Sequence, residues 1–403
     1  MSGAVGVLVA YADGTDSART PPAAVAAAGG FVGGDVRVLL GWTPEDRPWL
    51  ASPRLAGRTV LAGYALAPAV ADGRLHYLPV RLSTLPRLVA GDLRPDVAVV
   101  TGVRRGSDLV FGSTVGWGPA VARAAERVVV EIDEDGLDLG GPVIEGNIVA
   151  TVARPVSSGP GPVPRPPDAV DREIGRTVAS LLPRECTLQV GPGGVADAIL
   201  DSLDQPVHIW SGILSDAIAQ LYRRGLIVGE VTGAYVWGRE VAELAAAGRL
   251  RVRPLEETHD LTVISSIDRF AACNTALQVG LDGSVNVERV GGRYVAGVGG
   301  HADFCSAAVR SHGGLSIIAL RATTRGGTST IVPQVEVTST PRCDVELVVT
   351  EHGIADLRGL DDAERIQRMI GVAAPQHRAW LSVSASANTS TSASALVTHP
   401  TPT

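Results

Sequence analysis

A glycine-rich turn, Gly191-Pro192-Gly193-Gly194, is the strongest local indication of chemistry in this sequence. It lies between an apolar run over 187–190 and a helical pattern over 195–203, which together predict a strand, a tight turn and a helix. Glycines let a ligand approach the backbone closely, and the N–H groups at a helix start favour negative charge. Such a loop suits a thioester oxyanion, on which charge grows during attack. A turn whose glycines serve geometry alone is the other interpretation.

A second glycine-rich loop runs from Gly291 to Phe304 and contains Gly297, Gly299 and Gly300. Dense glycine inside an ordered domain indicates close approach, by a ligand or by another segment of backbone. The loop lacks the order of a dinucleotide-binding fingerprint. It also lacks the lysine of a phosphate-binding P-loop.

A third polar stretch follows the apolar run over 345–350 and includes Glu351, His352 and Asp356. The carboxyl end of a strand is where α/β sheets place ligands. Taken singly, however, Glu351 and Asp356 are more typical of caps and surface ion pairs than of catalysts. No G-x-S-x-G elbow is present, so an α/β-hydrolase is unsupported.

Composition narrows the class of protein. The 403 residues are 45% hydrophobic and 19% charged, with a net charge of −7. This balance predicts sizeable buried cores and argues against a nucleic-acid partner. All 35 basic residues are arginines, so any phosphate contact must use guanidinium or backbone N–H groups. The four cysteines are far apart, which favours free thiols without a metal site. With no signal peptide and no long apolar run, we expect a cytoplasmic protein that does not associate with a membrane.

The domain boundaries follow from one Pro/Gly-rich segment. Residues 156–167 cannot form a helix or a central strand, so they predict a linker between an N-terminal domain (1–155) and a C-terminal domain (168–381). After Leu381 the sequence becomes rich in Ser, Ala and Thr, which predicts a disordered tail over 382–403.

Both predicted domains alternate apolar runs with helical patterns. Buried strands are expected at 36–40, 97–101, 128–132, 187–190, 315–320 and 345–350, and helices at 120–127, 168–182 and 195–203. Apolar strands interleaved with helices indicate mainly parallel sheets covered on both faces. The predicted fold is therefore α/β, with two such domains enclosing a cleft. Nothing beyond this α/β pattern supports a nicotinamide-dependent oxidoreductase.

Together these stretches resemble the acetyl-CoA hydrolase/transferase family, the class I CoA-transferases of butyrate and 4-hydroxybutyrate type. The similarity covers nearly the whole chain and is densest over 188–360. The segments that carry it are GPGGVADAIL, NTALQVGLDGSVNVE, GVGGHADF, SIIAL, TIVP and TPRCDVELVVTEHGIADLRGL, with looser matches at RLHYLPVRLSTLPRL and over 96–132.

The resemblance implies two similar α/β domains around the active site. It implies a glutamate that attacks an acyl-CoA and passes through an anhydride to a glutamyl-CoA thioester. Coenzyme A is then substrate or product rather than a permanently bound cofactor, and a small carboxylic acid is a second candidate substrate. A homo-oligomer is the expected assembly. The residues implied to lie against CoA and the oxyanion are Gly191, Gly193, Gly194, Val195, Gly297, Gly299 and Gly300.

The sequence departs from the family at the nucleophile. The family glutamate belongs to a pattern like His-Thr-Glu-Met-x-Ser-Asp, whereas this chain has HIWSGILSD over 208–216. Alignment on Ser215 and Asp216 puts Gly212 at the glutamate position. Glycine has no side chain, so neither covalent intermediate can form there. The glycine motif expected in the N-terminal domain is also blurred, at AYADGT over 10–15.

Three outcomes follow for activity. Water can enter the vacated space and make the protein a hydrolase. A different nucleophile can act, as in an enzyme of a specialised pathway, with Ser211, Ser215, His301 and Cys305 as the candidates. Alternatively, the protein can bind acyl-CoA without turnover as an inactive or regulatory homologue, or bind an acyl-carrier thioester. For each side chain a structural role is favoured: Ser215 as a helix cap, Cys305 as a small buried residue and His301 as a hydrogen-bonding group.

Overall fold

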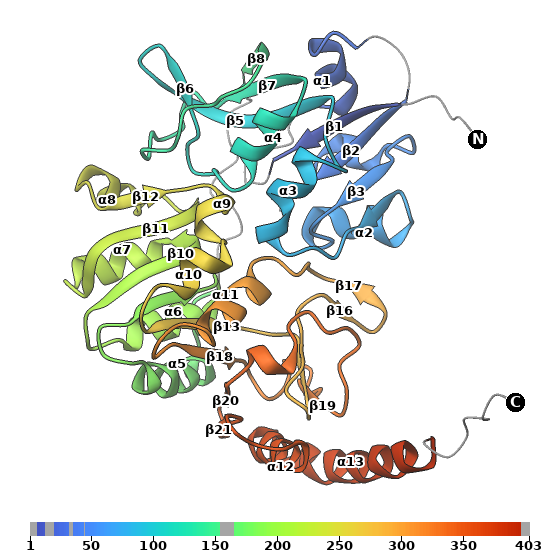
Figure 1. Cartoon of the computed structure of the whole chain (residues 1–403), viewed down its shortest axis with the longest axis vertical. Helices are drawn as coiled ribbons and strands as arrows, with labels where there is room; N and C mark the ends of the chain where they lie inside the picture. The colour runs from blue at the N-terminus through green and yellow to red at the C-terminus, as the bar shows by residue number, and fades with distance from the viewer. Residues whose placement is uncertain (1–5, 13–19, 32–34, 44, 154–164, 396–403) are drawn as a thin grey trace, which may run out of the picture.

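Two large β-sheets organise the chain, one in each half of the sequence, in the computed structural model (Figure 1). The structure describes residues 6–12, 20–31, 35–43, 45–153 and 165–395. In Figure 1 the N-terminal half lies at the top, and the C-terminal half lies below it. The last two helices form a layer at the opposite end of the molecule from the N-terminal sheet.

The N-terminal half contains eight strands and short helices. In chain order its elements are β1 (Val7–Tyr11), α1 (Pro22–Ala28), β2 (Val36–Leu40), η1 (Pro48–Ala51), β3 (Gly57–Thr59), η2 (Tyr64–Leu66), α2 (Ala67–Ala71), β4 (Leu75–Tyr77), η3 (Leu82–Thr84), α3 (Leu85–Ala90), β5 (Val97–Arg105), β6 (Asp108–Val110), α4 (Gly118–Ala124), β7 (Arg127–Ile132) and β8 (Ile148–Ala153).

The C-terminal half contains the remaining elements. These are α5 (Ala169–Leu181), β9 (Thr187–Val190), α6 (Gly194–Ser202), β10 (Val207–Ser215), α7 (Asp216–Arg223), β11 (Ile227–Trp237), α8 (Ala242–Ala246), β12 (Leu250–Val252), α9 (Leu255–Thr258), α10 (Leu261–Ser265), β13 (Phe270–Asn274), β14 (Gln278–Gly280), β15 (Val285–Asn286), β16 (Arg289–Val290), β17 (Arg293–Tyr294), α11 (His301–Ala308), β18 (Leu315–Ala319), β19 (Ile331–Val332), η4 (Arg342–Asp344), β20 (Leu347–Thr350), β21 (Gly353–Asp356), α12 (Asp362–Val372) and α13 (Pro375–Ala395).

The two large sheets share one strand order. The first runs β4-β3-β2-β1-β5-β7-β8, with β6 paired to β5, and the second runs β12-β11-β10-β9-β13-β18-β20-β21. In each sheet the first strand lies in the middle, the next three extend to one side and the later strands to the other. All pairings are parallel except those of β6 and β21. The predicted fold of two similar, mainly parallel α/β domains is confirmed.

The six strands predicted from short apolar runs overlap β2, β5, β7, β9, β18 and β20, because a parallel sheet covered on both faces buries every side chain. Strand β5 is fully buried over its first four residues. In the second sheet, one face packs on α5, α6 and α7 through Ile174, Ile199 and Ile218. The other face packs on α10 and α11 through Ile264 and Phe304.

The predicted domain limits remain a prediction, because only the last three residues of the predicted linker, 165–167, are described. Strand β8 ends at Ala153 and α5 begins at Ala169, while most of the linker and the AYADGT motif from residue 13 onward lie outside the described residues. The tail differs from expectation. Helix α13 continues to Ala395, whereas disorder was predicted from residue 382. Residues 382–395 contain four alanines, which favour a helix, beside six serines and two threonines, which favour it less.

The two halves contact each other through backbone hydrogen bonds. The N–H of Val236 donates to the carbonyl of Ser113 at 2.8 Å, and the N–H of Leu255 donates to Gly116 at 2.9 Å. Side chains add to this contact, since Ser83 donates to the buried carboxylate of Asp303 through its hydroxyl at 2.7 Å. The domains are therefore joined by paired polar groups as well as by apolar packing.

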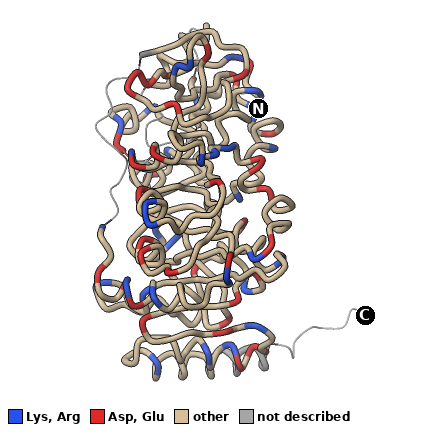
Figure 2. Tube along the Cα trace, turned by 90° about the vertical axis from the view of Figure 1, so that its left-hand side faces the viewer, with Lys and Arg blue, Asp and Glu red and all other residues tan. Residues whose placement is uncertain are grey.

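Charged side chains are dispersed over the surface. Figure 2 shows arginines and acidic residues interspersed along the full length of the described chain. Most ion pairs join exposed groups, which stabilise a fold only slightly. In the part of the chain that the structure describes, no helix is long and apolar enough to cross a membrane.

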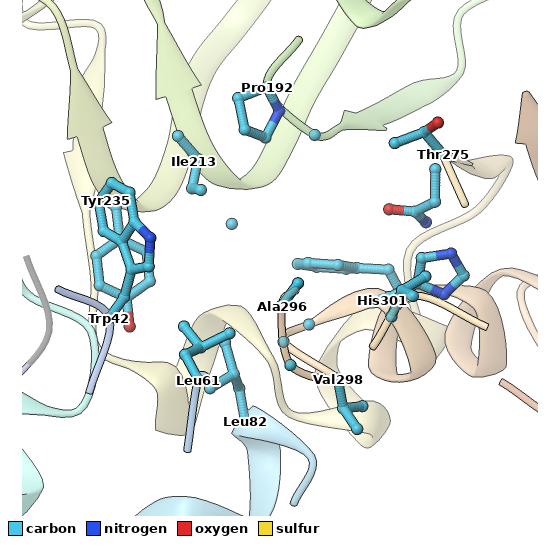
Figure 3. A pocket seen from close by; sticks show the side chains of 18 of the residues that line it. Trp42, Leu61, Leu82, Pro192, Ile213, Tyr235, Thr275, Ala296, Val298 and His301 are labelled. Carbon is cyan, nitrogen blue, oxygen red and sulfur yellow. The ribbon is translucent and has the colours of Figure 1, made fainter. Parts of the chain in front are cut away.

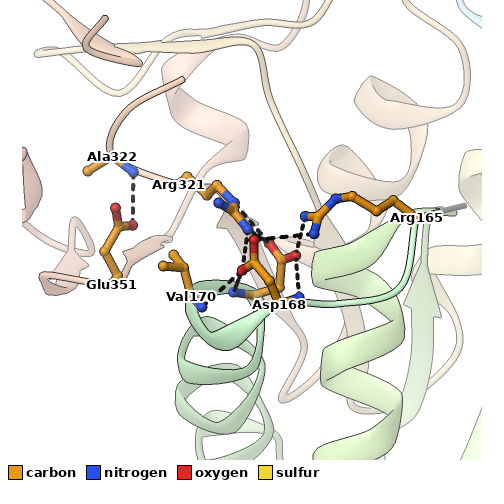
Figure 4. A network of polar contacts seen from close by, with 7 residues as sticks. Arg165, Asp168, Val170, Arg321, Ala322 and Glu351 are labelled. Carbon is orange, nitrogen blue, oxygen red and sulfur yellow. Dashed lines mark hydrogen bonds and ion pairs between the residues drawn. The ribbon is translucent and has the colours of Figure 1, made fainter. Parts of the chain in front are cut away.

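One ion-pair network is more buried and fastens the start of α5 (Figure 4). The Asp171 side chain is 3% exposed and accepts hydrogen bonds from Arg165 at 2.7 Å and from Arg321 at 2.8 and 2.9 Å. Asp168 caps the helix by accepting from the N–H groups of Val170 and Asp171. The guanidinium of Arg321 lowers the pKa of the Asp168 carboxyl well below its usual range. The network thus ties the linker end to the loop after β18.

We predict that Asp171→Ala lowers the free energy of unfolding by about 3 kcal/mol, because removing one partner of a buried pair leaves the others unpaired. Urea unfolding followed by tryptophan fluorescence measures this loss. Glu173→Ala, an exposed change on the same helix, is the control and should cost less than about 0.5 kcal/mol. A loss below about 1 kcal/mol for Asp171→Ala would contradict the assignment.

Candidate functional site

A cavity of about 370 Å³ lies at the carboxyl ends of β9, β10 and β13, facing loops of the N-terminal half (Figure 3). Gln189, Val190 and Gly191 line it from β9, Gly212 from β10 and Asn274 from β13. In the second sheet the chain runs from β9 to one side and from β13 to the other. The cavity therefore lies at the point where an open parallel sheet places its ligand.

Aromatic side chains from both halves form one wall of the cavity. Trp42 stacks on Trp237 with ring centroids 4.5 Å apart and contacts Tyr64 edge-on at 5.6 Å. Figure 3 shows Trp42 beside Tyr235 on one side, with Thr275 and His301 on the opposite side. The other apolar side chains that line the cavity include Leu61, Leu82, Ile213, Ala296, Val298 and Phe304. The site is thus a largely apolar chamber with a few polar groups.

Gly212 lies on the wall of this cavity. A Cβ placed on it would lie 3.4 Å from His259 Nε2 and 3.4 Å from a ring carbon of Phe304, which is ordinary contact. A side chain at position 212 would therefore point between these two rings. The adjacent Ser211 is fully buried, and its hydroxyl donates to the carbonyl of Val190 at 2.6 Å. Ser211 does not line the described cavity, and its hydrogen bond gives it a structural role.

His259 faces the cavity from the residue after α9. It is 1% exposed, and its ring packs against Phe304 with centroids 4.7 Å apart. Nδ1 lies 3.0 Å from the hydroxyl of Thr258, and that hydroxyl donates to the carbonyl of Pro254 at 3.1 Å. Burial lowers the pKa of His259 to about 3. The ring is therefore neutral near pH 7.

His301 also lines the cavity, at the first residue of α11. Its Nδ1 lies 2.7 Å from the hydroxyl of Thr340 and 3.7 Å from the sulfur of Cys305. Burial lowers the pKa of His301 to about 4, and the nearby backbone of Thr275 opposes this shift. Nε2 is buried and has no correctly aligned hydrogen-bond partner among the described residues. The contact with Thr340 agrees with the hydrogen-bonding role predicted for this residue.

Gln189 and Asn274 form a closed amide pair on the cavity floor. Gln189 Nε2 donates to Asn274 Oδ1 at 3.2 Å, and Asn274 Nδ2 donates to Gln189 Oε1 at 3.0 Å. Asn274 Nδ2 also lies 3.6 Å from the Cys305 sulfur. Burial raises the pKa of the Cys305 thiol to about 12, so this cysteine is a buried thiol rather than a thiolate.

The structure brings together part of the glycine set that the sequence singled out. Gly191, Gly297, Gly299 and Gly300 line the cavity, whereas Gly193, Gly194 and Val195 are absent from its described lining. A Cβ on Gly194 would lie 3.0 Å from a carboxylate oxygen of Asp171, so this glycine lies against the ion-pair network at the start of α5. The CoA contacts implied for all seven residues remain predictions, and four of these residues line the cavity.

Glycine is required at Gly300 by a close approach to His259. A Cβ there would lie 2.5 Å from His259 Nε2, closer than real atoms come. Part of the second glycine-rich loop therefore exists to admit an imidazole ring. This is a third interpretation of that loop, beside a ligand or a crossing backbone.

Three other expectations concern structural roles. Ser215 occupies the N-cap position of α7, but its side chain makes no capping hydrogen bond. Glu351 accepts from the N–H of Ala322 at 2.9 Å, and Asp356 pairs with Arg358 at 2.6 Å (Figure 4 shows the first contact). Both carboxylates thus serve the structure, as their residue types suggested.

Sequence reasoning missed His259, the amide pair and the aromatic wall. His259 follows two glutamates in LEETHD, where nothing marks it as an inward-facing ring. Trp42 and Trp237 are 195 positions apart, so no local pattern could join them. Their only signal is the scarcity of aromatic residues, 4% of the chain, which makes a cluster of them notable.

The described lining of the cavity contains no Asp, Glu, Lys or Arg, so its titratable groups are the two neutral histidines and the Tyr64 and Tyr235 hydroxyls. Within the described ranges, no group of three His, Cys, Asp or Glu side chains has the arrangement of a metal site. The arrangement can therefore bind an uncharged, apolar group and offer it hydrogen bonds from imidazole, amide and backbone N–H groups.

An open α/β site between two like domains is the arrangement of CoA-transferase-type folds. Residues 241–385 match the acetyl-CoA hydrolase/transferase C-terminal domain. The chain is 29% identical over 341 residues to 4-hydroxybutyrate coenzyme A transferase from Clostridium kluyveri, covering 79% of each protein. It is 30% identical over 341 residues to succinyl-CoA:acetate/propanoyl-CoA:succinate CoA transferase from Fasciola hepatica, covering 77% of this chain and 70% of the relative.

The fold is also that of a solved structure, RipA from Yersinia pestis. The TM-score is 0.79 at 24% identity, over 96% of this chain and 94% of that one. The chain belongs to the acetyl-CoA hydrolase/transferase family.

The depressed pKa of His259 predicts how stability changes with pH. The folded ring stays neutral down to about pH 3, whereas in the unfolded chain it takes up a proton near pH 6.5. The unfolded state thus binds more protons between these values. Stability from this group is present above pH 6.5 and is lost as the pH falls toward 3.

From pH 7 to pH 5 we expect the wild-type protein to lose about 2 kcal/mol more unfolding free energy than His259→Gln. Urea unfolding at both pH values measures the difference. Other titrating groups are common to both proteins and cancel in the comparison. An equal loss in the two proteins would show that His259 is not buried in its neutral form.

Proposed function

We propose that this protein hydrolyses acyl-CoA thioesters that carry uncharged, apolar acyl groups. Family membership supports the thioester as substrate, since the named relatives act on CoA esters. The observation that carries the choice of hydrolysis is Gly212. It lines the cavity at the position where alignment with the family pattern expects the nucleophilic glutamate.

Without a carboxylate at position 212, an acyl-enzyme anhydride and a glutamyl-CoA thioester have no atom on which to form. The backbone at Gly212 is open to the cavity, so the space beside it can hold a water molecule next to a bound thioester. Direct attack by water then replaces the two-step exchange through the enzyme. The products are a carboxylic acid and free CoA.

The cavity wall supports an apolar acyl group. Aromatic rings of Trp42, Tyr64 and Trp237 offer flat surfaces that suit aliphatic or aromatic chains. A free carboxylate acceptor such as acetate or succinate would need a cation to replace its hydration. None is present in the described lining. This favours water over a carboxylic acid as the acceptor.

The direct experiment incubates the protein with hexanoyl-, benzoyl-, acetyl- and succinyl-CoA and follows free thiol. We expect thiol release without any added acid, faster for hexanoyl- and benzoyl-CoA and slowest for succinyl-CoA, whose carboxylate would be buried unpaired. Isothermal calorimetry measures the binding of CoA independently of thiol release. Binding without thiol release would identify the inactive or regulatory homologue instead. Acetate-dependent CoA exchange would overturn the proposed mechanism.

Gly212→Glu tests the position itself. Its Cβ meets only ordinary contacts, so the side chain can enter the cavity. We expect the hydrolysis rate to fall at least tenfold, because the new side chain occupies the space of the water. We also expect covalent labelling of the variant by an acyl-CoA that is radiolabelled in its CoA portion, because the new carboxylate can form the glutamyl-CoA thioester.

Gly212→Ala is the matched control, since it adds the Cβ but no carboxylate. It should show no covalent label. Equal labelling of Gly212→Ala and Gly212→Glu would show that the adduct does not depend on a carboxylate at this position.

A further inference from the structure

We propose that His259 is the general base that activates the attacking water, with Thr258 holding its ring in the required tautomer. This inference rests on the proposed hydrolysis. It assigns to a residue outside the glycine loops the proton transfer that a carboxylate-free site needs. Four structural observations support it.

The first observation is the fixed orientation of the imidazole. Thr258 donates its single hydroxyl proton to the carbonyl of Pro254 at 3.1 Å. Its oxygen therefore accepts the contact from His259 Nδ1 at 3.0 Å, which places the ring proton on Nδ1. Nε2 is left with a lone pair.

The second observation is the direction of that lone pair. His259 lines the cavity. Its ring contacts the Thr258 hydroxyl through Nδ1, and no described residue forms a hydrogen bond with Nε2. A Cβ on Gly212 would lie 3.4 Å from Nε2, so Nε2 borders the space that Gly212 leaves open. A water that enters the cavity beside Gly212 can therefore come within hydrogen-bond reach of Nε2.

The third observation is the rigidity of the ring. The Phe304 ring packs against the imidazole, tilted by 50° with centroids 4.7 Å apart. Trp210 Nε1 donates to the carbonyl of Thr258 at 3.1 Å, which fixes the backbone beside His259. Gly300 has no Cβ and so lets the loop before α11 pass close to Nε2. These contacts hold the base in place before substrate binds.

The fourth observation is the comparison with His301, the other imidazole of the cavity. His301 Nδ1 contacts both the Thr340 hydroxyl and the Cys305 sulfur. Its Nε2 is buried against the protein, whereas His259 Nε2 borders the gap at Gly212. His301 thus suits a hydrogen-bonding role on the cavity wall, and His259 suits proton transfer.

The reaction balances with water as the only co-reactant. Nε2 of His259 takes one proton from water as the water oxygen bonds to the thioester carbonyl carbon, which gives a tetrahedral oxyanion and an imidazolium. The oxyanion re-forms the carbonyl and breaks the carbon–sulfur bond. The imidazolium returns its proton to the leaving thiolate. Acyl-CoA and water become a carboxylic acid and CoA thiol, and His259 ends neutral.

The test compares His259→Gln with wild type, using the acyl-CoA that the wild-type protein hydrolyses fastest. We expect kcat to fall at least 100-fold with KM changed less than threefold, because the amide fills the space but cannot accept a proton. CoA binding by calorimetry should be retained. A kcat within threefold of wild type would overturn the assignment while leaving the proposed hydrolysis intact.

His259→Ala provides a second, independent readout. Added imidazole should raise its hydrolysis rate at least tenfold, because the truncated side chain leaves room for the free base. His312→Gln is the matched control, since its side chain is 92% exposed, and it should keep the wild-type rate without response to imidazole. Folded His259→Ala that shows no rescue would count against a base at this position.

The two proposals fail in different ways. If the wild-type protein releases no thiol from any of the acyl-CoAs, the proposed function falls, and the role of His259 falls with it. If wild type is active and both His259 variants retain its rate, only the role of His259 is overturned.

Discussion

Backbone hydrogen bonds between the two halves of the chain hold the cavity together. The N–H of Val236 donates to Ser113, and the N–H of Val115 donates to Ala234 at 3.1 Å. Buried amide groups at such a junction must be paired, so the halves dock in one register and cannot slide. This register sets Trp237 of β11 against Trp42, which follows β2 in the other half of the chain. The shape of the apolar wall therefore depends on main-chain bonds that lie outside the cavity.

An apolar chamber imposes a condition on each polar group at its edge. Gln189 and Asn274 satisfy each other, Ser211 donates to a carbonyl, and His259 contacts Thr258. An unpaired polar group in this setting costs free energy, and a charge costs more. Both histidines are accordingly neutral, and the described lining has no ionised side chain near pH 7. Such surroundings suit a thioester, which is uncharged at its reacting carbon and becomes charged only during attack.

Although the two large sheets share a strand order, they contribute different parts of the site. At the carboxyl edge of the second sheet, β9, β10 and β13 present backbone, amide and glycine positions to the ligand. The first sheet covers that edge with side chains from the loops after β2, β3 and β4, among them Trp42, Tyr64 and Leu82. The second sheet thus supplies the polar groups of the site, and the first sheet supplies the apolar side chains that cover it and limit the access of water and ions.

The sequence by itself determined six of the strands, the two-sheet α/β class and the family, and it led to the prediction that Gly212 stands at the position of the family glutamate. These properties are local, because the period of apolar residues and the order of short motifs are written in neighbouring positions. Strand β9 was predicted at 187–190, and these are its observed limits. The helical extent of α13 was missed, since a segment rich in Ser and Ala is ambiguous by composition alone.

Only the tertiary structure decided which residues meet. His259 lies 47 positions from Gly212, and their closeness follows from the return of the chain from β10 through β11 and α9 to the same sheet edge. The tertiary structure also gives the residues of the first glycine-rich turn different surroundings. Gly191 lines the cavity, whereas Gly194 lies against Asp171. Contacts of this kind depend on sheet order and domain docking, which are set by the whole chain at once and leave no pattern in a short stretch of sequence.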